Sequence, residues 1–183
     1  MTFGQTGLPW VMTSPHIPYP VSAELYPVTG IMGELYVMSI GVGYTLPFQL
    51  IAADWVDGDK LAANLNSLKL PGVLFRPVHF TPYYSVAKGT LIHGVQIHIT
   101  DISKANLTLV QFYAMQELHS MYPDKNLFEM CNKSRISMFD KVCGSDKVRL
   151  AFTKNFQVSD IREMWMKDVA PFRVKAKKYY LYR

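Results

Sequence analysis

The sequence predicts an α+β fold: a small mixed β-sheet covered by several helices in a single domain. Short β-rich segments occupy the first half of the chain, and helical periodicity dominates after residue 103. Strands and helices do not alternate in regular βαβ units. Of the 183 residues, 49% are apolar, which is enough to bury a core without a metal or disulfides.

The first thirty residues are predicted to form an extended connector packed on the domain. Proline fixes φ and moves the preceding residue away from helical geometry. Aromatic side chains in this stretch are expected to pack against the domain or against a missing neighbour. We therefore divide the chain into a connector, residues 1–30, and an accessory α+β domain, residues 31–183. The connector's prolines are Pro9, Pro15, Pro18, Pro20 and Pro27.

Four segments are predicted to be strands: residues 34–42, 48–55, 72–82 and 91–100. The third contains Pro77, which favours an edge strand or a bulge. The fourth is the clearest, because its apolar and polar residues alternate. Val95, Ile97 and Ile99 fall on one side, and Gln96 and His98 on the other.

Helices are predicted from caps and from apolar residues at helical spacing. Asp57 is placed to cap a short helix that carries Leu61, Leu65 and Leu68. The best helix runs from Ser103 to about Met121, with Asp101 or Ser103 as its cap. Shorter helices are expected at 134–142, 145–154 and 159–168, and the Tyr-rich tail is a candidate last strand.

The net charge of +5 would indicate a nucleic-acid partner only if the basic residues clustered. They gather only near the C-terminus, at residues 173–178, where long basic stems can cover apolar surface. We therefore expect no nucleic acid. Cys131 and Cys143 have no neighbour at metal-ligand spacing, so no zinc site is expected. The two cysteines could form one disulfide or remain two buried free thiols, and the sequence leaves both alternatives open.

The apolar stretches are interrupted before they reach eighteen residues, so no membrane span is expected. The opening residues MTFGQTGLPW lack the basic and apolar regions of a signal peptide. A periplasmic or secreted location would therefore need a signal upstream of this chain.

Motifs that carry catalysis are missing from the sequence. It contains no GxSxG, P-loop or HExxH pattern. Glycoside hydrolysis generally needs two carboxyl groups beside the bond. The acidic residues mostly suit helix caps or helix surfaces, with Glu34 and Asp54 as exceptions. We expect no catalytic residue, cofactor or metal in this chain alone.

Several segments resemble, in order, the C-terminal half of the NamZ-like exo-N-acetylmuramidase family. They are GLPWVMTSPHIP at 7–18, SIGVGYTLPF at 39–48, LNSLKLPGVLFRPVHFTP at 65–82, GVQIHITD at 94–101 and FDKVCGSDKVR at 139–149. The resemblance covers essentially the whole chain. It implies an exported two-domain parent whose N-terminal Rossmann-like domain carries the hydrolytic machinery, while this domain completes the cleft. The implied substrate is the non-reducing-end N-acetylmuramic acid of peptidoglycan.

The sequence departs from the family pattern at two positions. Many relatives have Ser-Glu-Gly-Arg-Gly-Thr where residues 39–44 read SIGVGY, so Ile40 and Val42 replace an acid and a base. Charge-assisted contacts from these positions to a sugar are excluded. The departure implies either a different glycan specificity or binding without that contact.

Sugar sites combine aromatic faces with polar groups on loops. The segment from Ser39 to Phe48 fits, because Gly41 and Gly43 allow close backbone approach. The alternative to a cleft-completing domain is a stand-alone, non-catalytic module that binds cell-wall glycan. The predicted sugar-binding residues are Ser39, Gly41, Gly43, Tyr44, Thr45, Arg76, Tyr83, Tyr84 and His98.

Overall fold

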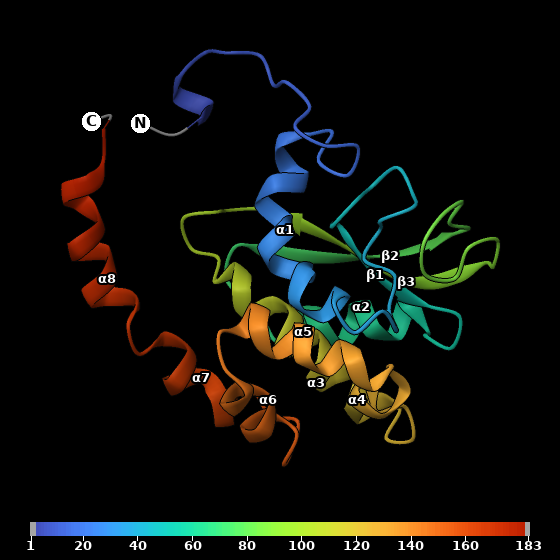
Figure 1. The fold of residues 1–183 in the computed structure, drawn as a ribbon. Coiled ribbons are helices and arrows are strands. Elements are labelled where there is room, and N and C mark those ends of the chain that lie inside the picture. The colour runs from blue at the N-terminus through green and yellow to red at the C-terminus, as the bar shows by residue number, and fades with distance from the viewer. Residues whose placement is uncertain (1–2, 182–183) are drawn as a thin grey trace.

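A three-stranded antiparallel sheet forms the centre of the computed structural model, which describes residues 3–181. The strands are β1 (Leu50–Ala53), β2 (Val73–Phe80) and β3 (Ile92–Ile99), in the order β1-β3-β2 (Figure 1). The predicted α+β class is confirmed, although the strands pair antiparallel and not in a mixed arrangement. Pro77 lies in the edge strand β2, where a missing amide is tolerated.

Helices make up most of the remaining structure. Single 3₁₀ turns occur at Phe3–Gln5 (η1) and Lys177–Tyr179 (η2). The α-helices are α1 (Pro20–Gly33), α2 (Gly58–Ser67), α3 (Leu107–Met121), α4 (Leu127–Met130), α5 (Lys133–Cys143), α6 (Asp146–Phe152), α7 (Ser159–Met166) and α8 (Val169–Ala176).

One face of the sheet is covered by helices and carries the main core. Ile51, Val95 and Ile97 point to this face and join a continuous apolar cluster. α2 packs on β2 and β3, and α3 packs on both α1 and α2. Asp57 caps α2 by accepting from the Lys60 amide at 3.1 Å, as predicted.

The opposite face of the sheet is covered by loops. Its core is a small cluster of Leu50, Ala52, Phe80 and Ile92. The partly buried side chains packed on it come largely from the loops that precede β1 and follow β2. We call these the first loop, residues 34–49, and the second loop, residues 81–91.

The prediction that residues 1–30 are extended is wrong for residues 20–30, which form most of α1. Pro20 stands at a permitted first position, but Pro27 lies inside the helix. Buried Gln111 of α3 anchors this helix from outside, since it donates to the Pro27 carbonyl at 3.1 Å and accepts from the Met32 amide at 3.0 Å. Tertiary packing thus overrides the local proline signal. The division into connector and domain stays a prediction.

The predicted strand at 34–42 is also wrong. Tyr36 has a φ of +58°, and only Ser39 pairs with the sheet, through an isolated bridge to Ala52. The best helix begins at Leu107, after Asn106, and not near Ser103. A turn occupies 101–105, because the Asp101 carboxylate accepts from the Ser103 amide and hydroxyl.

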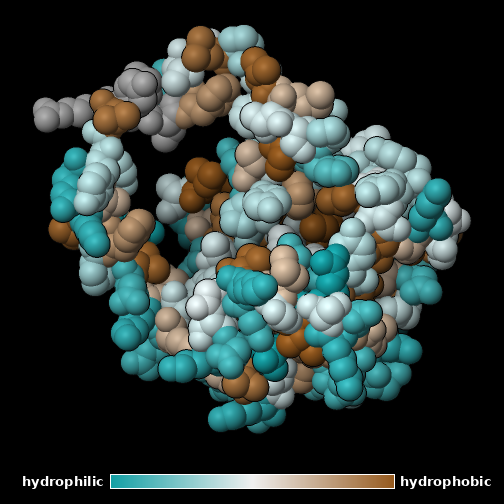
Figure 2. Space-filling model, in the orientation of Figure 1, coloured by the Kyte–Doolittle hydropathy of each residue, from teal (hydrophilic) through white to brown (hydrophobic). Residues whose placement is uncertain are grey.

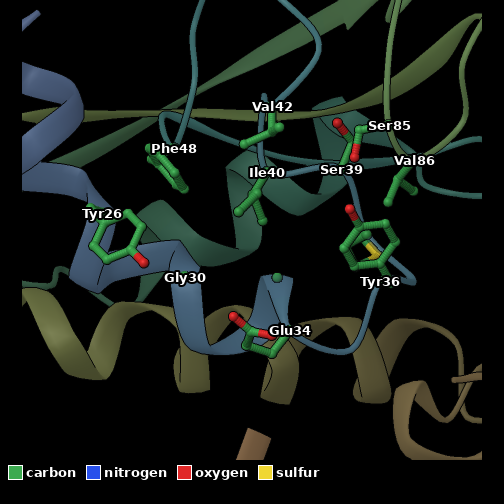
Figure 3. A pocket seen from close by; sticks show the side chains of 12 residues that line it. Tyr26, Gly30, Glu34, Tyr36, Ser39, Ile40, Val42, Phe48, Ser85 and Val86 are labelled. Atoms are coloured by element: carbon green, nitrogen blue, oxygen red, sulfur yellow. The ribbon is translucent and has the colours of Figure 1, made fainter. Parts of the chain in front are cut away.

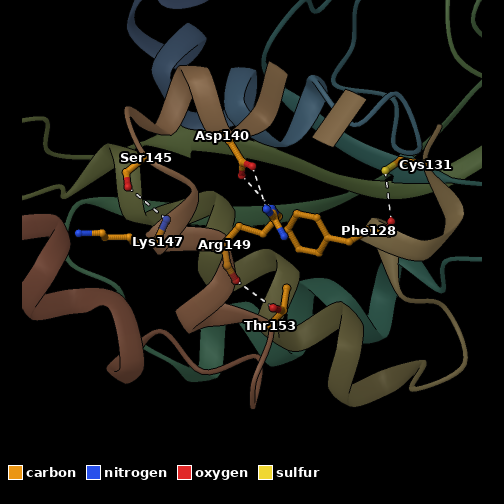
Figure 4. Close-up of polar contacts among 7 residues, drawn as sticks. All are labelled: Phe128, Cys131, Asp140, Ser145, Lys147, Arg149 and Thr153. Atoms are coloured by element: carbon orange, nitrogen blue, oxygen red, sulfur yellow. Dashed lines mark hydrogen bonds and ion pairs between the residues drawn. The ribbon is translucent and has the colours of Figure 1, made fainter. Parts of the chain in front are cut away.

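Ion pairing and capping hold the C-terminal helices together (Figure 4). Arg149 of α6 donates to both oxygens of Asp140 in α5, at 2.8 and 2.9 Å. Ser145 caps α6, as predicted.

Cys131 and Cys143 are free thiols, and burial raises the pKa of Cys143 to about 12. The tail forms η2 and a bend at 177–181 and not the expected strand, while residues 182–183 lie outside the described chain.

Candidate functional site

The two loops that cover the small core are tied to each other by backbone contacts. The Tyr83 amide donates to the Gly43 carbonyl at 2.9 Å. Gly43 has a φ of +90°, and a Cβ there would collide with the Tyr84 carbonyl oxygen. Glycine is therefore required at this position for two reasons: the backbone is left-handed, and there is no space for a side chain. The structure brings the predicted segments 39–45 and 83–84 together.

Within this pair of loops, the predicted side chains take different positions. Ser39 is buried and hydrogen-bonded through its backbone to Ala52. Tyr44 packs on Phe80, with ring centroids 4.5 Å apart. Thr45 and Tyr83 are exposed, while Tyr84 stacks on His16. The polar groups that can reach a ligand are thus fewer than the sequence list suggested.

Arg76 and His98 lie apart from the loop contacts, further along the same sheet face. Arg76 and Phe80 share that face because they are an even number of residues apart on β2. Arg76 donates to Gln96 at 3.1 Å. The Nε2 atom of His98 is buried and has no hydrogen-bond partner in the described part of the chain. Neither residue lines the cavity described next.

A cavity of about 200 Å³ opens between α1 and the two loops (Figure 3). Four hydroxyl-bearing side chains and one carboxylate line its wall, together with apolar groups. Ser39 is the predicted residue that contributes to it. The lining residues are Tyr26, Gly30, Gly33, Glu34, Tyr36, Met38, Ser39, Ile40, Val42, Phe48, Ser85 and Val86.

Glu34 supplies the carboxylate of this cavity. It pairs with Arg135 of α5 at 3.7 Å, and the Arg135 guanidinium lies 4.1 Å from the centroid of the Tyr36 ring. Both charged side chains are partly exposed, so the pair remains accessible to solvent and to a ligand. A hydrolytic site with two opposed carboxyl groups is not formed by this lining.

Backbone strain is concentrated around the same cavity. Tyr36, Phe48 and Ser85 all have positive φ values, between 58° and 66°, and all three line it. Left-handed backbone is costly for bulky residues and persists where the surrounding structure enforces it. The two loops are therefore held in one specific shape at this cavity.

The two positions that depart from the family pattern also line the cavity. Figure 3 shows Ile40 between Tyr26 and Tyr36, with Glu34, the residue that directly follows α1, facing it. Val42 stands beside Phe48. The wall therefore presents aliphatic groups where many relatives are expected to present an acid and a base.

Tyr26, Tyr36 and Ser85 were not among the site residues predicted from the sequence, and Glu34 stood out only as an acidic residue beside a predicted strand. The useful signal lay in α1 and its C-cap, where Tyr26, Gly30 and the C-cap residue Glu34 are spaced four residues apart and share one stripe. Pro27 led to the prediction that this segment is extended, so the helix was not predicted. Tyr36 and Ser85 owe their positions to left-handed turns, for which neither residue gives a signal.

The described residues contain no group of three or more His, Cys, Asp or Glu side chains that could hold a metal. A wider depression lies along α5 and the start of α6, and includes Asp140 and Asp146. Both oxygens of Asp140 are already bonded to Arg149, so these acids do not form a free catalytic pair. In residues 3–181, no helix has the length and apolar character needed to cross a bilayer.

Residues 24–182 match the family described as exo-beta-N-acetylmuramidase NamZ, C-terminal. This chain belongs to that family. The match confirms the resemblance seen in the sequence and spans all three strands and both loops.

Two relatives show how much of a longer protein this chain represents. It is 37% identical over 182 residues to the peptidoglycan beta-N-acetylmuramidase NamZ of Bacillus subtilis strain 168, covering all of this chain and 42% of that protein. A crystal structure of a DUF1343 family protein from Bacteroides fragilis NCTC 9343 superposes with a TM-score of 0.96 at 54% identity. That match covers this whole chain and 48% of the other. The chain thus spans less than half the length of these relatives.

Proposed function

We propose that this chain is the C-terminal accessory domain of a peptidoglycan glycosidase of the exo-N-acetylmuramidase type, and that its two loops form one wall of the substrate cleft. The catalytic residues would lie in an N-terminal domain of the parent protein. The observation that carries the proposal is a loop-walled cavity of about 200 Å³ that has hydroxyls, aromatic rings and one carboxylate. Peptidoglycan as substrate would place the protein in the periplasm or outside the cell, which requires an export signal upstream of this chain in the parent protein.

Sugar recognition by this wall would use two kinds of contact. Aromatic rings pack on the C–H faces of a sugar, while hydroxyl and carboxylate groups bond its hydroxyls. Tyr26, Tyr36 and Glu34 supply both kinds within the cavity. The predicted residues Thr45, Tyr83 and Tyr84 extend the surface outward from it, and Arg76 offers a cation further along the sheet face for the lactyl carboxylate of N-acetylmuramic acid.

The first test compares two proteins on a chromogenic N-acetylmuramic acid substrate. One is this chain alone, and the other is a chimera in which this chain replaces the matched part of the Bacteroides fragilis relative. We expect release of the sugar by the chimera and none by the chain alone. Turnover by the isolated chain would overturn the proposal, because it would require a complete catalytic set in these 183 residues.

A second test asks whether the cavity touches the sugar. Tyr26→Phe removes one hydroxyl while retaining the ring contact with Phe48 at 4.6 Å. We expect kcat/KM of the chimera to fall about tenfold, as for the loss of one useful hydrogen bond. Tyr19→Phe is the matched control, since Tyr19 is 51% exposed against 53% for Tyr26 and does not line the cavity. Equal effects of the two substitutions would count against the assignment.

A stand-alone glycan-binding module is the second candidate, and the exposed rings of Tyr83 and Tyr84 favour it. Purified sacculi separate the two functions. Strong retention of the isolated chain, lost in the Tyr83→Ala/Tyr84→Ala double variant, would support the module. Passage of the chain without retention would support a domain that works only within its parent.

A further inference from the structure

We propose that the concave side between the body of the domain and its C-terminal segment is the docking surface for the N-terminal domain of the parent protein. We call residues 169–181 the C-terminal arm. The proposal rests on the proposed function for the existence of that domain. It adds which surface of this chain holds it.

The C-terminal arm has apolar side chains that nothing in the described chain covers. α8 contains no buried residue, and Val174 and Leu181 are 72% and 88% exposed. An isolated helix of eight residues is marginal in water, so α8 needs a packing partner. Figure 2 shows an open gap between the arm and the rest of the molecule.

The body offers a second apolar surface, next to α1. A cavity of about 320 Å³ lies there, lined by Tyr26, Pro27, Gly30, Ile31, Glu34, Thr108, Val142 and Trp165. Trp165 belongs to α7, which leads directly into the arm. The arm thus begins four residues after Trp165, a side chain of the cavity wall.

Gly30 lines both this cavity and the cavity proposed to bind sugar, and its missing side chain leaves the backbone of α1 open to a partner. Glycine inside a helix costs about 0.5–1 kcal/mol relative to alanine. A Cβ at Gly30 would meet no heavy atom of the described chain within 4 Å, so internal packing does not require glycine. Gly33 differs, because a Cβ there would meet Ile40 at 2.5 Å.

The distribution of side chains on α8 favours a protein that surrounds the helix over a flat lipid surface. Residues two apart on a helix point to nearly opposite sides. Phe172 and Val174 are two apart, as are Arg173 and Lys175, so apolar and basic groups occur all around α8. A membrane-surface helix would instead keep its apolar groups on one face. The basic groups further indicate acidic residues on the partner.

The relatives identify the occupant. This chain covers 42% of one relative and 48% of the other, and the matched family is the C-terminal part. More than half of each relative therefore lies outside the matched region. A contiguous exposed apolar surface is typical of a protein interface. The N-terminal arm, residues 3–19, adds Leu8, Val11 and Met12, which are also exposed.

The test measures trypsin cleavage in the C-terminal arm by mass spectrometry. Arg173, Lys175, Lys177 and Lys178 provide sites there, and exposed Lys154 in the turn after α6 is the internal control. We expect cleavage in the arm to be at least about tenfold slower in the chimera than in the isolated chain, because docking stabilises the helix. Cleavage at Lys154 should not change. Equal rates in the arm would overturn the proposal.

Val142 and Leu150 give a matched pair of variants. Each is an aliphatic residue on a helix and 49% exposed, but only Val142 lines the cavity beside α1. In the chimera, Val142→Arg should restore rapid cleavage of the arm, and Leu150→Arg should not. If the arm stays protected in the Val142→Arg variant, the cavity beside α1 is not part of the docking surface, and the proposal is contradicted.

Two other partners for this surface, a second copy of the chain and a lipid membrane, can be tested in the same way. Dimerisation of the isolated chain that Val174→Ser abolishes would overturn the proposal in favour of a second copy. Sedimentation with vesicles containing phosphatidylglycerol would overturn it in favour of lipid. If the chimera is insoluble, the cleavage assay is repeated with the unmatched part of the relative added to the isolated chain. An arm that is protected in a chimera without glycosidase activity would support docking while refuting the proposed function.

Discussion

The two faces of the sheet are built in opposite ways. The helical face is backed by a continuous core that extends through α1, α2 and α3 to α7. The loop face buries four apolar residues and is otherwise covered by segments without regular structure. Stability is thus concentrated on the helical side, whereas the cavity, with its strained residues and the departures from the family pattern, lies where α1 meets the two loops. A rigid scaffold that carries variable loops is a common arrangement for binding sites.

Core truncations should separate the two faces most clearly. Phe112 is fully buried and contacts the rings of Phe139, Phe152 and Trp165. Phe112→Ala should lower the free energy of unfolding by about 3–5 kcal/mol, measured by urea denaturation. Phe80→Ala in the small core should cost less, about 2–3 kcal/mol, because loops can relax into the space. A larger loss at Phe80 would contradict the division.

Substituting two glycines, one in the loops and one in α1, should change the stability of the protein in opposite directions. Gly43→Ala should destabilise the protein by about 2 kcal/mol, because it adds left-handed strain and displaces the Tyr84 carbonyl. Gly30→Ala should stabilise it by about 0.5–1 kcal/mol, since the position is helical and unobstructed. Thermal unfolding of both variants measures the difference. Two changes of the same sign would rule out this account of the glycines.

Two ion pairs sharpen the contrast further. The Asp140–Arg149 pair is bidentate, and its side chains are 17% and 20% exposed. Asp140→Ala leaves a partly buried guanidinium unpaired and should cost about 2 kcal/mol. The Glu34–Arg135 pair is longer and more exposed, so Glu34→Ala should cost about 0.5 kcal/mol. Glu34→Ala should instead reduce kcat/KM of the chimera, which assigns the pair to the cavity.

The sequence predicted the elements whose local signals agree with the tertiary structure. The alternation in residues 91–100 located the central strand, and Asp57 located the start of α2. Pro77 indicated an edge strand correctly. In each case a pattern of neighbouring residues is sufficient, because the environment that stabilises the element is reflected in its own side chains.

Elements that depend on distant residues could not be predicted in this way. α1 contains Pro27 and relies on Gln111, which is 84 positions away in the sequence. The cavity combines α1 with two loops whose left-handed residues, Tyr36, Phe48 and Ser85, are not glycines. The predicted site residues therefore identified the correct loops without identifying the cavity beside them.

The smallest expected effect concerns the cap of α2, on the helical face. The Asp57 carboxylate accepts from the Lys60 amide and pairs with its ammonium group at 3.1 Å, and these contacts lower the Asp57 pKa below 3.8. A lowered pKa in the folded state stabilises the protein above pH 3.8, and the gain disappears as the pH falls through the folded-state pKa. Asp57→Asn retains a capping acceptor but removes the charge. We expect the urea midpoint of the variant to be slightly lower at pH 7 and to converge on the wild-type value as the pH falls below the folded-state pKa of Asp57. A difference between the two proteins that grows as the pH falls would show that the charge does not stabilise the cap.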